Sequence, residues 1–225
     1  MHIYQEEKKV IIAEGKKQVW IEPWGENSFR VRMTAEPKMD ENDWALTEKV
    51  PEVPVEISFE TVDVTDPWYQ GEEYSQYHQT GTQATVVNGK ITAKVSHEGW
   101  IQFLNQRGEV LTEEYWRNRN RINRYCVPLR IDARELKPVP GGTDYELTAR
   151  FEAYDDEKIF GMGQYQEKHL NKKGAVLELA HRNSQASVPF FVSSRGYGFF
   201  WNNPAIGTAA FGTNKTEWYA KRTKN

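Results

Sequence analysis

Side chains that could ligate a metal or act as nucleophiles are spread thinly along the sequence. Five histidines stand alone, without the His-x-His or His-x₃-His spacing of a metal site: His2, His78, His97, His169 and His181. The single cysteine, Cys126, lies in an apolar run (residues 125–129), which is typical of a buried and inert thiol. We therefore expect no metal, no cofactor and no cysteine nucleophile.

Carboxylates are abundant but are not placed as a catalytic pair. Glycoside hydrolysis takes two carboxyl groups on either side of the scissile bond. With 32 Asp and Glu in 225 residues some pair is always close, and none stands at the end of an apolar strand. Gly161-Met162-Gly163 is similar to a phosphate-binding turn, but Gln166 replaces the third glycine and no helical run follows. We expect no catalytic residue in this chain.

Charge and composition narrow the classes of partner. A net charge of −3 leaves no positive surplus for nucleic acid or for an anionic membrane surface. No stretch approaches the roughly 18 apolar residues of a membrane span, and the charged N-terminus is not followed by the apolar core of a signal peptide. We expect a cytoplasmic protein with neither nucleic acid nor membrane as a partner.

Alternation of apolar and polar residues dominates the sequence and predicts an all-β, antiparallel sandwich. Asn88-Gly89 between the runs 82–87 and 90–95 is a strong hairpin signal, and we expect a type I′ turn there. The further strands that we expect lie at 17–21, 28–33, 100–104, 109–111, 125–131, 144–152, 175–180, 186–193, 197–202, 206–211 and 216–221.

Two stretches interrupt this rhythm. Residues 34–81 hold four prolines and many acids, which favours a long loop excursion from one sheet. Residues 112–124 carry four arginines, and this pattern favours a solvated loop, with a sugar or subunit contact as the alternative. Pro189 lies inside an expected strand, so an edge position or a bulge is expected there.

The most distinctive block of the sequence lies near the C-terminus. It resembles the stretch that precedes the barrel in family 31 glycoside hydrolases, and it is closest to the bacterial α-xylosidase-like branch. The resemblance covers roughly residues 80–220. The segments that carry it are Phe160-Gly161-Met162-Gly163-Gln164, Leu170-Asn171-Lys172-Lys173-Gly174, Val188-Pro189-Phe190-Phe191 and Ser193-Ser194-Arg195-Gly196-Tyr197-Gly198-Phe199-Phe200-Trp201-Asn202-Asn203-Pro204.

This resemblance implies that residues 1–225 form the N-terminal galactose-mutarotase-like supersandwich of a larger enzyme. The catalytic (β/α)₈ barrel, which needs roughly 250 residues, is absent from this chain. The parent enzyme would hydrolyse terminal α-xylosidic or α-glucosidic bonds of an oligosaccharide with retention. The chain's main partner would then be its own C-terminal barrel.

Within the resemblance, the short loop at residues 181–184 has the best claim to a functional role. In the family this loop can reach over the mouth of the barrel. Arg182 and Asn183 could therefore donate hydrogen bonds to a sugar beyond the cleavage point. From the residues alone, a plain turn explains the segment equally well.

Two other classes of function stay open from the sequence. An aldose epimerase on the same sandwich would use His97 or His169 as an acid beside a carboxylate. A sugar-binding module would instead need an exposed aromatic platform, and the chain has eight Trp, eleven Tyr and ten Phe. The full open reading frame would separate these classes from the family 31 reading.

The aromatic residues also carry an expectation about surface and core. A domain built to sit on a barrel should expose a contiguous aromatic patch. We expect several of Trp68, Tyr69, Trp116, Trp201, Phe211 and Trp218 to form it and to support a homo-oligomer. The simplest position of Phe190, Phe199 and Trp201 is nonetheless in the core.

Overall fold

The computed structural model describes residues 1–41, 46, 50–65, 72–116 and 131–224. Within these residues the strands pair antiparallel, as predicted, and the 3₁₀ helix η2 (Glu72–Tyr77) is short. No helix of the described part is long and apolar enough to cross a membrane. The chain divides into a first compact unit (1–37, 50–110 and 116–131) and a second (38–49, 111–115 and 132–225).

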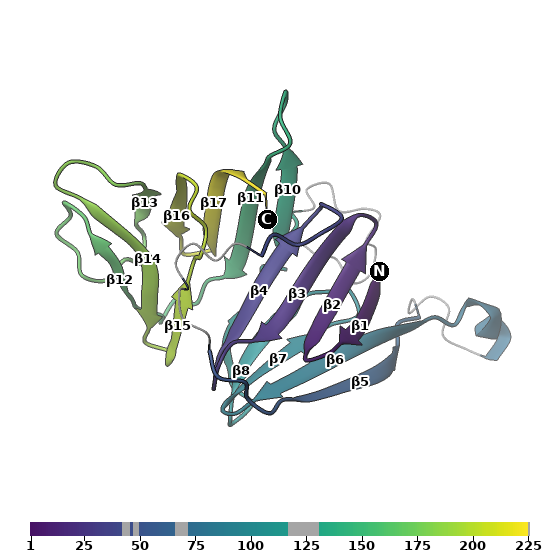
Figure 1. The fold of residues 1–225 in the computed structure, drawn as a ribbon. Helices are drawn as coiled ribbons and strands as arrows, with labels where there is room; N and C mark the ends of the chain where they lie inside the picture. Colours follow the sequence, from purple (N-terminus) through teal and green to yellow (C-terminus); the bar gives the residue numbers. More distant parts are fainter. Residues whose placement is uncertain (42–45, 47–49, 66–71, 117–130, 225) are drawn as a thin grey trace. The chain divides into compact units, whose positions relative to one another are not determined.

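The first unit is built around two antiparallel sheets (Figure 1). One sheet has the order β1-β2-β3-β4, and the other has the order β5-β6-β7-β8-β9. Their strands are β1 (His2–Glu6), β2 (Lys9–Glu14), β3 (Lys17–Pro23), β4 (Phe29–Thr34), β5 (Glu56–Asp63), β6 (Thr80–Asn88), β7 (Ile91–Val95), β8 (Ile101–Asn105) and β9 (Val110–Glu113). The residues of β9 after Val110 are counted with the second unit.

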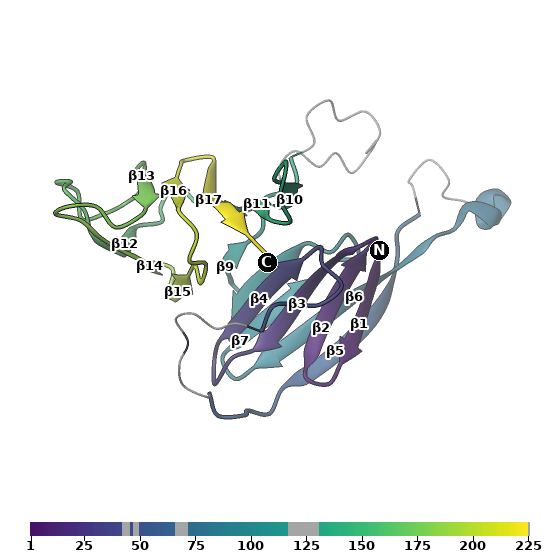
Figure 2. The ribbon, with the colours of Figure 1, turned by 45° about the horizontal axis from the view of Figure 1, so that its top comes forward.

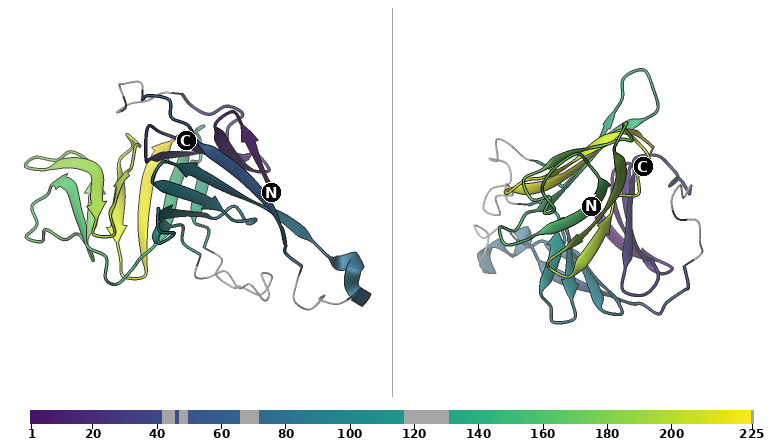
Figure 3. Two further views of the ribbon diagram at one scale, coloured as in Figure 1. Left: turned by 90° about the horizontal axis from the view of Figure 1, so that it is seen from below. Right: turned by 90° about the vertical axis from the view of Figure 1, so that its left-hand side faces the viewer.

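These two sheets face each other and enclose an apolar core. In β6, Ala84, Val86 and Asn88 are buried while the residues between them are not, because alternate side chains of a strand point to opposite faces. The rings of Phe29 on β4 and Phe103 on β8 lie 6.0 Å apart, so the two sheets are in contact. Figures 2 and 3 show the purple strands β1–β4 as a layer over the teal strands.

The hairpin predicted at Asn88-Gly89 is confirmed, but its turn differs from the expected type I′. Asn88 pairs with Ile91, so the central residues are Gly89 and Lys90, and of these two Gly89 alone has a positive φ, at 58°. Asn88 stays in the strand, where its buried amide donates to the carbonyls of Gly25 (2.8 Å) and Ser28 (2.7 Å). Asn88 is thus not a central residue of the turn, and its side chain instead binds the backbone between β3 and β4.

The second unit also consists of two antiparallel sheets. The five-stranded sheet has the order β10-β11-β17-β16-β13, and the three-stranded sheet has the order β12-β14-β15. Their strands are β10 (Arg134–Pro138), β11 (Tyr145–Glu152), β12 (Ile159–Gln164), β13 (Val176–Leu179), β14 (Ala186–Ser193), β15 (Tyr197–Phe200), β16 (Gly207–Phe211) and β17 (Lys215–Thr223).

Aromatic rings fill the space between the two sheets of the second unit. Phe191 and Phe199 of the three-stranded sheet stack on each other at 5.5 Å and on Trp218 of β17 at 6.2 and 5.0 Å. Phe211 of β16 meets Phe191 edge-on at 5.6 Å. Trp218 and Phe211 are fully buried. Each of these rings removes a large apolar area from water, so this cluster holds the unit together.

A bulge interrupts the pairing of β12 with β14. Gly161 pairs with Phe191 but Gly163 pairs with Ser187, so β14 carries extra residues around Pro189. This confirms the bulge as one of the two predicted settings for that proline. On the opposite strand Gly161, Met162 and Gly163 all have positive φ (126°, 71° and 87°). A Cβ on Gly163 would lie 2.2 Å from the carbonyl oxygen of Ala186, so no side chain fits there.

The strands expected in the second half are confirmed to within two residues where the structure describes them, whereas nearly all of 125–131 lies outside the described residues. The excursion expected at 34–81 needs a correction. It contains β5, which pairs with β6 from Glu56↔Val87 to Asp63↔Thr80. Most of β5 is exposed, so its sequence lacks the apolar alternation of an inner strand.

Candidate functional site

The segment singled out at residues 181–184 belongs to a tight turn between β13 and β14. The backbone N–H of Gln185 donates to the carbonyl of Arg182 at 3.0 Å, and these two residues form an isolated antiparallel bridge. Ser184 adopts a φ of 65°, in the left-handed region that many tight turns require. The side chains of all four residues are exposed. The segment is therefore short and fixed, and it presents polar groups to solvent.

Arg182 is oriented by an ion pair on the surface. Its Nε and Nη2 donate to the carboxylate of Glu178, four residues earlier on β13, at 3.0 and 2.6 Å. This hydrogen bond raises the pKa of Arg182 and lowers that of Glu178. Because both groups are exposed, the pair orders the guanidinium more than it stabilises the fold. Asn183 lies beside it with an exposed amide.

Tyr165 fixes the base of this turn. Its hydroxyl lies 2.9 Å from the carbonyl oxygen of Glu178 and 2.8 Å from Oγ of Ser187, and so it joins the segment after β12 to β13 and β14. Burial is the main reason why the pKa of Tyr165 is raised. The position of the turn is thus set by the strands on both sides and not by the turn alone.

A second polar loop, residues 165–171, is held from inside by a buried lysine. The Lys172 side chain is 7% exposed, and its Nζ donates to the carboxylate of Glu167 and to the carbonyl of His169 (3.0 Å). The loop presents His169 and Leu170, with Leu170 78% exposed. The sequence gives no sign of this arrangement, because nothing in the local pattern distinguishes Lys172 from the lysine that follows it.

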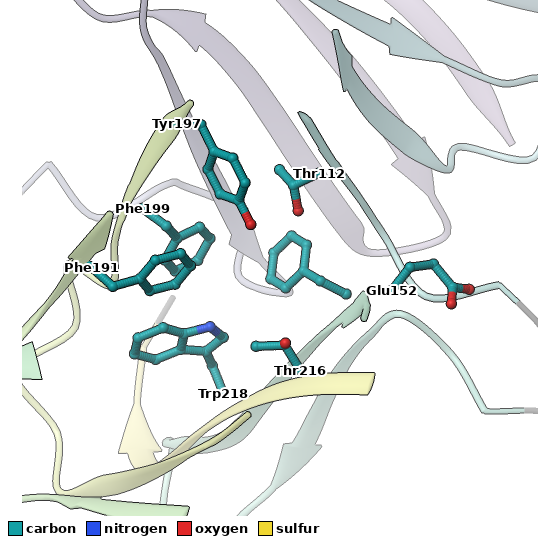
Figure 4. A pocket seen from close by; sticks show the side chains of 8 residues that line it. Thr112, Glu152, Phe191, Tyr197, Phe199, Thr216 and Trp218 are labelled. Carbon is teal, nitrogen blue, oxygen red and sulfur yellow. The ribbon is translucent and has the colours of Figure 1, made fainter. Parts of the chain in front are cut away.

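A small cavity lies among the aromatic rings of the second unit (Figure 4). Figure 4 shows the rings of Phe191, Phe199 and Trp218 layered on one side and Glu152 on the other. Nε1 of Trp218 is buried without a hydrogen-bond partner among the described residues. The accessible volume is about 10 Å³, which is room for roughly one water molecule and not for a sugar ring.

Glu157 lies buried beside this cluster in a closed network of hydroxyl groups. Its carboxylate accepts hydrogen bonds from Oγ of Ser193 (2.5 Å) and from the hydroxyl of Tyr197 (2.8 Å), and it is 3% exposed. Burial raises the pKa of the Tyr197 hydroxyl strongly, and the negative charge of Glu157 raises it further. A carboxylate enclosed in this way ties β15 to the loop before β12 and does not face a substrate.

The described residues do not assemble a hydrolytic or metal site. No group of three or more His, Cys, Asp or Glu gathers where it could hold a metal ion in the part of the chain that the structure describes. His97 is half-buried and His169 is exposed. The two histidines lie in different compact units. No described hydrogen bond joins either side chain to a carboxylate, so the geometry does not favour the epimerase alternative.

Tryptophans that could stack on a sugar are occupied or buried. Lys9 lies 4.0 Å and Arg32 5.2 Å from the ring centroid of Trp20, and Arg30 lies 4.7 Å from that of Trp24. None of the Trp side chains that the structure describes belongs to the exposed class. Among the described residues, therefore, no exposed tryptophan offers the platform of a sugar-binding module.

The prediction of a surface aromatic patch is wrong for three of the residues named for it. Trp201, Phe211 and Trp218 are 9%, 0% and 0% exposed, because they fill the space between the two sheets of the second unit. Trp116 is half-buried against Trp100, with ring centroids 5.5 Å apart. Trp68 and Tyr69 lie outside the described residues.

An exposed apolar face does exist, but on the outer side of the three-stranded sheet. We call it the apolar face, and it consists of Phe160, Val188, Phe190, Val192 and Phe200. Val188, Phe190 and Val192 alternate along β14 and are 50%, 44% and 48% exposed. Phe160 pairs with Val192, and Phe200 (39% exposed) pairs with Phe190, so all five point to one side. The expected core position of Phe190 is therefore wrong.

The comparison with family models identifies one match over most of the chain. It is described as the glycosyl hydrolase 31 N-terminal galactose mutarotase-like domain, and it matches residues 18–208.

Relatives with similar sequences are considerably longer than this chain. An uncharacterized family 31 glucosidase of Pseudescherichia vulneris is 43% identical over 213 residues, which cover 91% of this chain and 36% of the relative. Alpha-xylosidase A of Aspergillus niger is 31% identical over 232 residues, covering 94% and 27%. The crystal structure of a GH31 alpha-xylosidase from a soil metagenome is 44% identical with a TM-score of 0.84, covering 100% and 31%. The chain thus spans about a third of the length of these proteins.

Proposed function

Because the chain belongs to the galactose-mutarotase-like N-terminal domains of glycosyl hydrolase family 31, we propose that it is the non-catalytic N-terminal domain of a retaining α-glycosidase. The substrate of the whole enzyme is an oligosaccharide with a terminal α-xylosidic or α-glucosidic bond. The domain packs on the catalytic barrel that follows it and shapes the entrance for the substrate. The carboxylates that break the bond belong to the barrel.

One observation carries this proposal. The chain aligns over its whole length with about a third of a GH31 alpha-xylosidase at 44% identity. Within the described residues, the cavity of the second unit holds no more than about one water molecule, and the buried carboxylate of Glu157 beside it accepts hydrogen bonds from Ser193 and Tyr197. A glycosidase needs two carboxyl groups about 5–10 Å apart with room for a sugar between them. These two findings together favour a supporting role.

Activity assays on the short and the long chain test the proposal. The 225-residue chain should show no turnover of aryl α-xylosides or aryl α-glucosides above background, whereas the enzyme that continues into the barrel should hydrolyse at least one of them. Turnover by the short chain would contradict the proposal, as would an inactive long chain.

A mutarotation assay on the same short chain tests the epimerase alternative. We expect no acceleration of glucose or galactose mutarotation. If the chain accelerates mutarotation, and if this acceleration is lost in His97→Ala or in His169→Ala, a mutarotase-like activity would replace our proposal. The two variants serve as controls for each other, since the two histidines lie in separate units.

The turn at 181–184 is the part of the domain that we assign to the substrate entrance. Its support is geometric: Arg182 and Asn183 are exposed, and Tyr165 and Glu178 hold the turn in place. A fixed, polar and exposed turn can donate hydrogen bonds to sugar hydroxyls without moving on binding.

A further inference from the structure

The apolar face is unusual because the strand at its centre is apolar on both sides. An antiparallel sheet with one solvated face normally alternates apolar and polar residues. In β14, Phe191 points into the core while Val188, Phe190 and Val192 point outward. The three strands of this sheet contain no charged residue at all. Covering such a surface with another apolar surface lowers the free energy of the protein in water.

We propose that the apolar face of β12-β14-β15 is the surface on which the catalytic barrel docks, as the segment of the full-length chain that follows Asn225. This inference rests on the proposed function and specifies which side of the domain performs it. The turn at 181–184 and the outer side of the five-stranded sheet are not part of this surface.

The place where the chain leaves the domain supports this occupant. Near the end of β17, the backbone N–H of Lys221 donates to the carbonyl of Ile206 at 2.9 Å, and Oγ1 of Thr223 accepts from Nδ2 of Asn203 at 3.1 Å. Asn203 follows Phe200, the last residue of β15, by three positions, which is at most about 10 Å of extended chain. The described chain therefore ends in the same compact unit that carries the apolar face, so a domain attached after Lys224 starts from that unit.

Covalent attachment at this point also favours the barrel over a second copy of the chain. A tethered partner is present at a high effective concentration, so docking of the attached domain competes well against association between molecules. The relatives carry roughly two to three times the matched length in addition to the matched region, since the match covers 27–36% of them. The proposed partner is thus large enough to cover the whole face.

The shape of the face suits an apolar protein surface better than a sugar. A Cβ on Gly198 would lie 3.1 Å from Cζ of Phe190, so the missing side chain gives the phenyl ring its room and lets it lie flat over the strand. The five members of the face offer no hydrogen-bonding group, and a sugar site needs several of them beside its aromatic ring. The ring of helices around a barrel offers apolar ridges that can pack on such a sheet.

Thiol labelling tests the proposal directly. Val192→Cys places a thiol on the apolar face, and Thr208→Cys places one on the outer side of the five-stranded sheet, where Thr208 is also exposed. Each variant is made in the 225-residue chain and in the full-length enzyme and is labelled with a maleimide, with the parent chains as blanks for Cys126. We expect Val192→Cys to react at least tenfold more slowly in the full-length enzyme, and Thr208→Cys to react equally in both.

A charge substitution gives a second measurement. In the full-length enzyme Val192→Lys should lower the melting temperature by several degrees and increase cleavage by protease after residue 225, whereas Thr208→Lys should change neither. If Val192→Lys prevents folding, the labelling result still decides the matter, because a cysteine at this position is close to valine in size.

The outcomes separate this inference from the proposed function. Equal labelling of Val192→Cys in both chains, in a full-length enzyme that hydrolyses α-glycosides, would overturn the docking surface and leave the proposed function standing. Protection in the 225-residue chain that grows with protein concentration would identify a second copy as the occupant and would also overturn it. A full-length enzyme without glycosidase activity would contradict the proposed function instead.

Discussion

The two sheets of the second unit share one core, but the side chains on their outer faces differ in chemistry: one face is charged and the other is apolar. On the five-stranded sheet, Arg150 of β11 donates to Glu217 of β17 through Nε at 2.7 Å and pairs with Glu135 of β10 at 2.7 Å. Lys215 adds a further contact to Glu217 at 2.5 Å. On the three-stranded sheet the apolar face consists of Val and Phe side chains. The same fold therefore carries one face suited to water and one suited to a partner.

This difference shows that the outer side chains of a sheet decide whether its face is stable in water or needs a partner to cover it. A row of alternating charges across three strands is satisfied within its own sheet and needs no partner. A row of phenyl and valyl side chains can be satisfied only by covering it, and each such side chain gains about 1.5–3 kcal/mol when it is fully buried. Composition of the whole chain hides this contrast, because it averages the two faces.

The strongest test of the contrast uses two adjacent phenylalanines of β14. Phe191→Ala removes a ring that is 3% exposed, so it should destabilise the 225-residue chain by about 3–5 kcal/mol. Phe190→Ala removes the neighbouring ring, which is 44% exposed, and should cost about 1 kcal/mol. Urea unfolding measures both. Equal losses would mean that the inner and outer faces are not distinct.

The bulge in the three-stranded sheet gives the next largest effect. Gly163→Ala combines a φ of 87° with a Cβ 2.2 Å from the carbonyl oxygen of Ala186, and we expect a loss of roughly 2–4 kcal/mol. Gly174→Ala is the matched control, since Gly174 has a φ of 88° but open space around it, and it should lose about 1–2 kcal/mol. If both variants lose the same stability in thermal unfolding, the close approach of the strands is not what requires glycine at 163.

The charged outer face of the five-stranded sheet should make the stability of the protein depend on pH in the acid range. Burial alone would raise the pKa of Glu217, but the hydrogen bonds from Lys215 and Arg150 outweigh it, so the pKa in the folded protein is lowered from 4.5. The folded state therefore binds protons less readily, and this stabilisation is present above about pH 4.5 and lost as the pH falls through the lowered value. Because the group is partly solvated, the contribution stays within about 1 kcal/mol.

The measurement compares the parent chain with Glu217→Gln between pH 3 and pH 7. The parent should lose its advantage over the variant as the pH falls below about 4.5, because the glutamine carries no charge to titrate. A stability difference that is constant over this range would show that the Arg150–Glu217–Lys215 contacts do not act through charge.

The smallest effect on stability is expected at the turn, where function is the readout. Arg182→Ala should leave the melting temperature of the domain unchanged, because its pair with Glu178 is on the surface. In the full-length enzyme it should lower kcat/KM for a natural disaccharide several-fold to roughly a hundredfold. An aryl glycoside, whose leaving group lacks sugar hydroxyls, should be affected much less.

Asn183→Ala should show the same split between substrates, with a smaller loss because its amide is neutral. Glu178→Gln is the matched control for Arg182, since it weakens the orientation of the guanidinium and keeps its charge. Equal losses on both substrates, or none on either, would mean that residues 181–184 are only a turn. A sharply lower melting temperature would show instead that these side chains support the fold.

Alternation along single strands could be read from the sequence with fair accuracy. The strands 144–152 and 206–211 were predicted close to their observed bounds, because each shows apolar residues at a spacing of two. The strand 186–193 was also predicted correctly, although its residues 188–192 form a continuous apolar run. The ordered motifs from Phe160 to Asn203 also indicated the family that the comparison found. β5 was missed as a strand, and so were β1, β2, β10 and β12. Most side chains of β5 are exposed, so this strand shows little apolar alternation.

The candidate site was less accessible to the same reasoning. Arg182 and Asn183 were placed on a short exposed turn, as the structure has them, but their link to Glu178 and Tyr165 depends on the pairing of β13 with its neighbours. The enclosed Glu157 was not foreseen, because its partners Ser193 and Tyr197 lie 36 and 40 residues away along the chain. The buried Lys172 was not foreseen either, because its burial depends on how the loop before it folds back over its side chain.

The sequence by itself determined that this chain forms antiparallel sheets and that one of the two adjacent residues Phe190 and Phe191 must face inward. Only the tertiary structure decided which one. A shift of one residue in register exchanges the two faces of a strand, and the bulge at Pro189 together with the stacking of Phe191 on Trp218 sets that register. The outward position of Phe190 on the apolar face therefore results from packing between strands that are far apart in the chain, and the local sequence pattern does not contain this information.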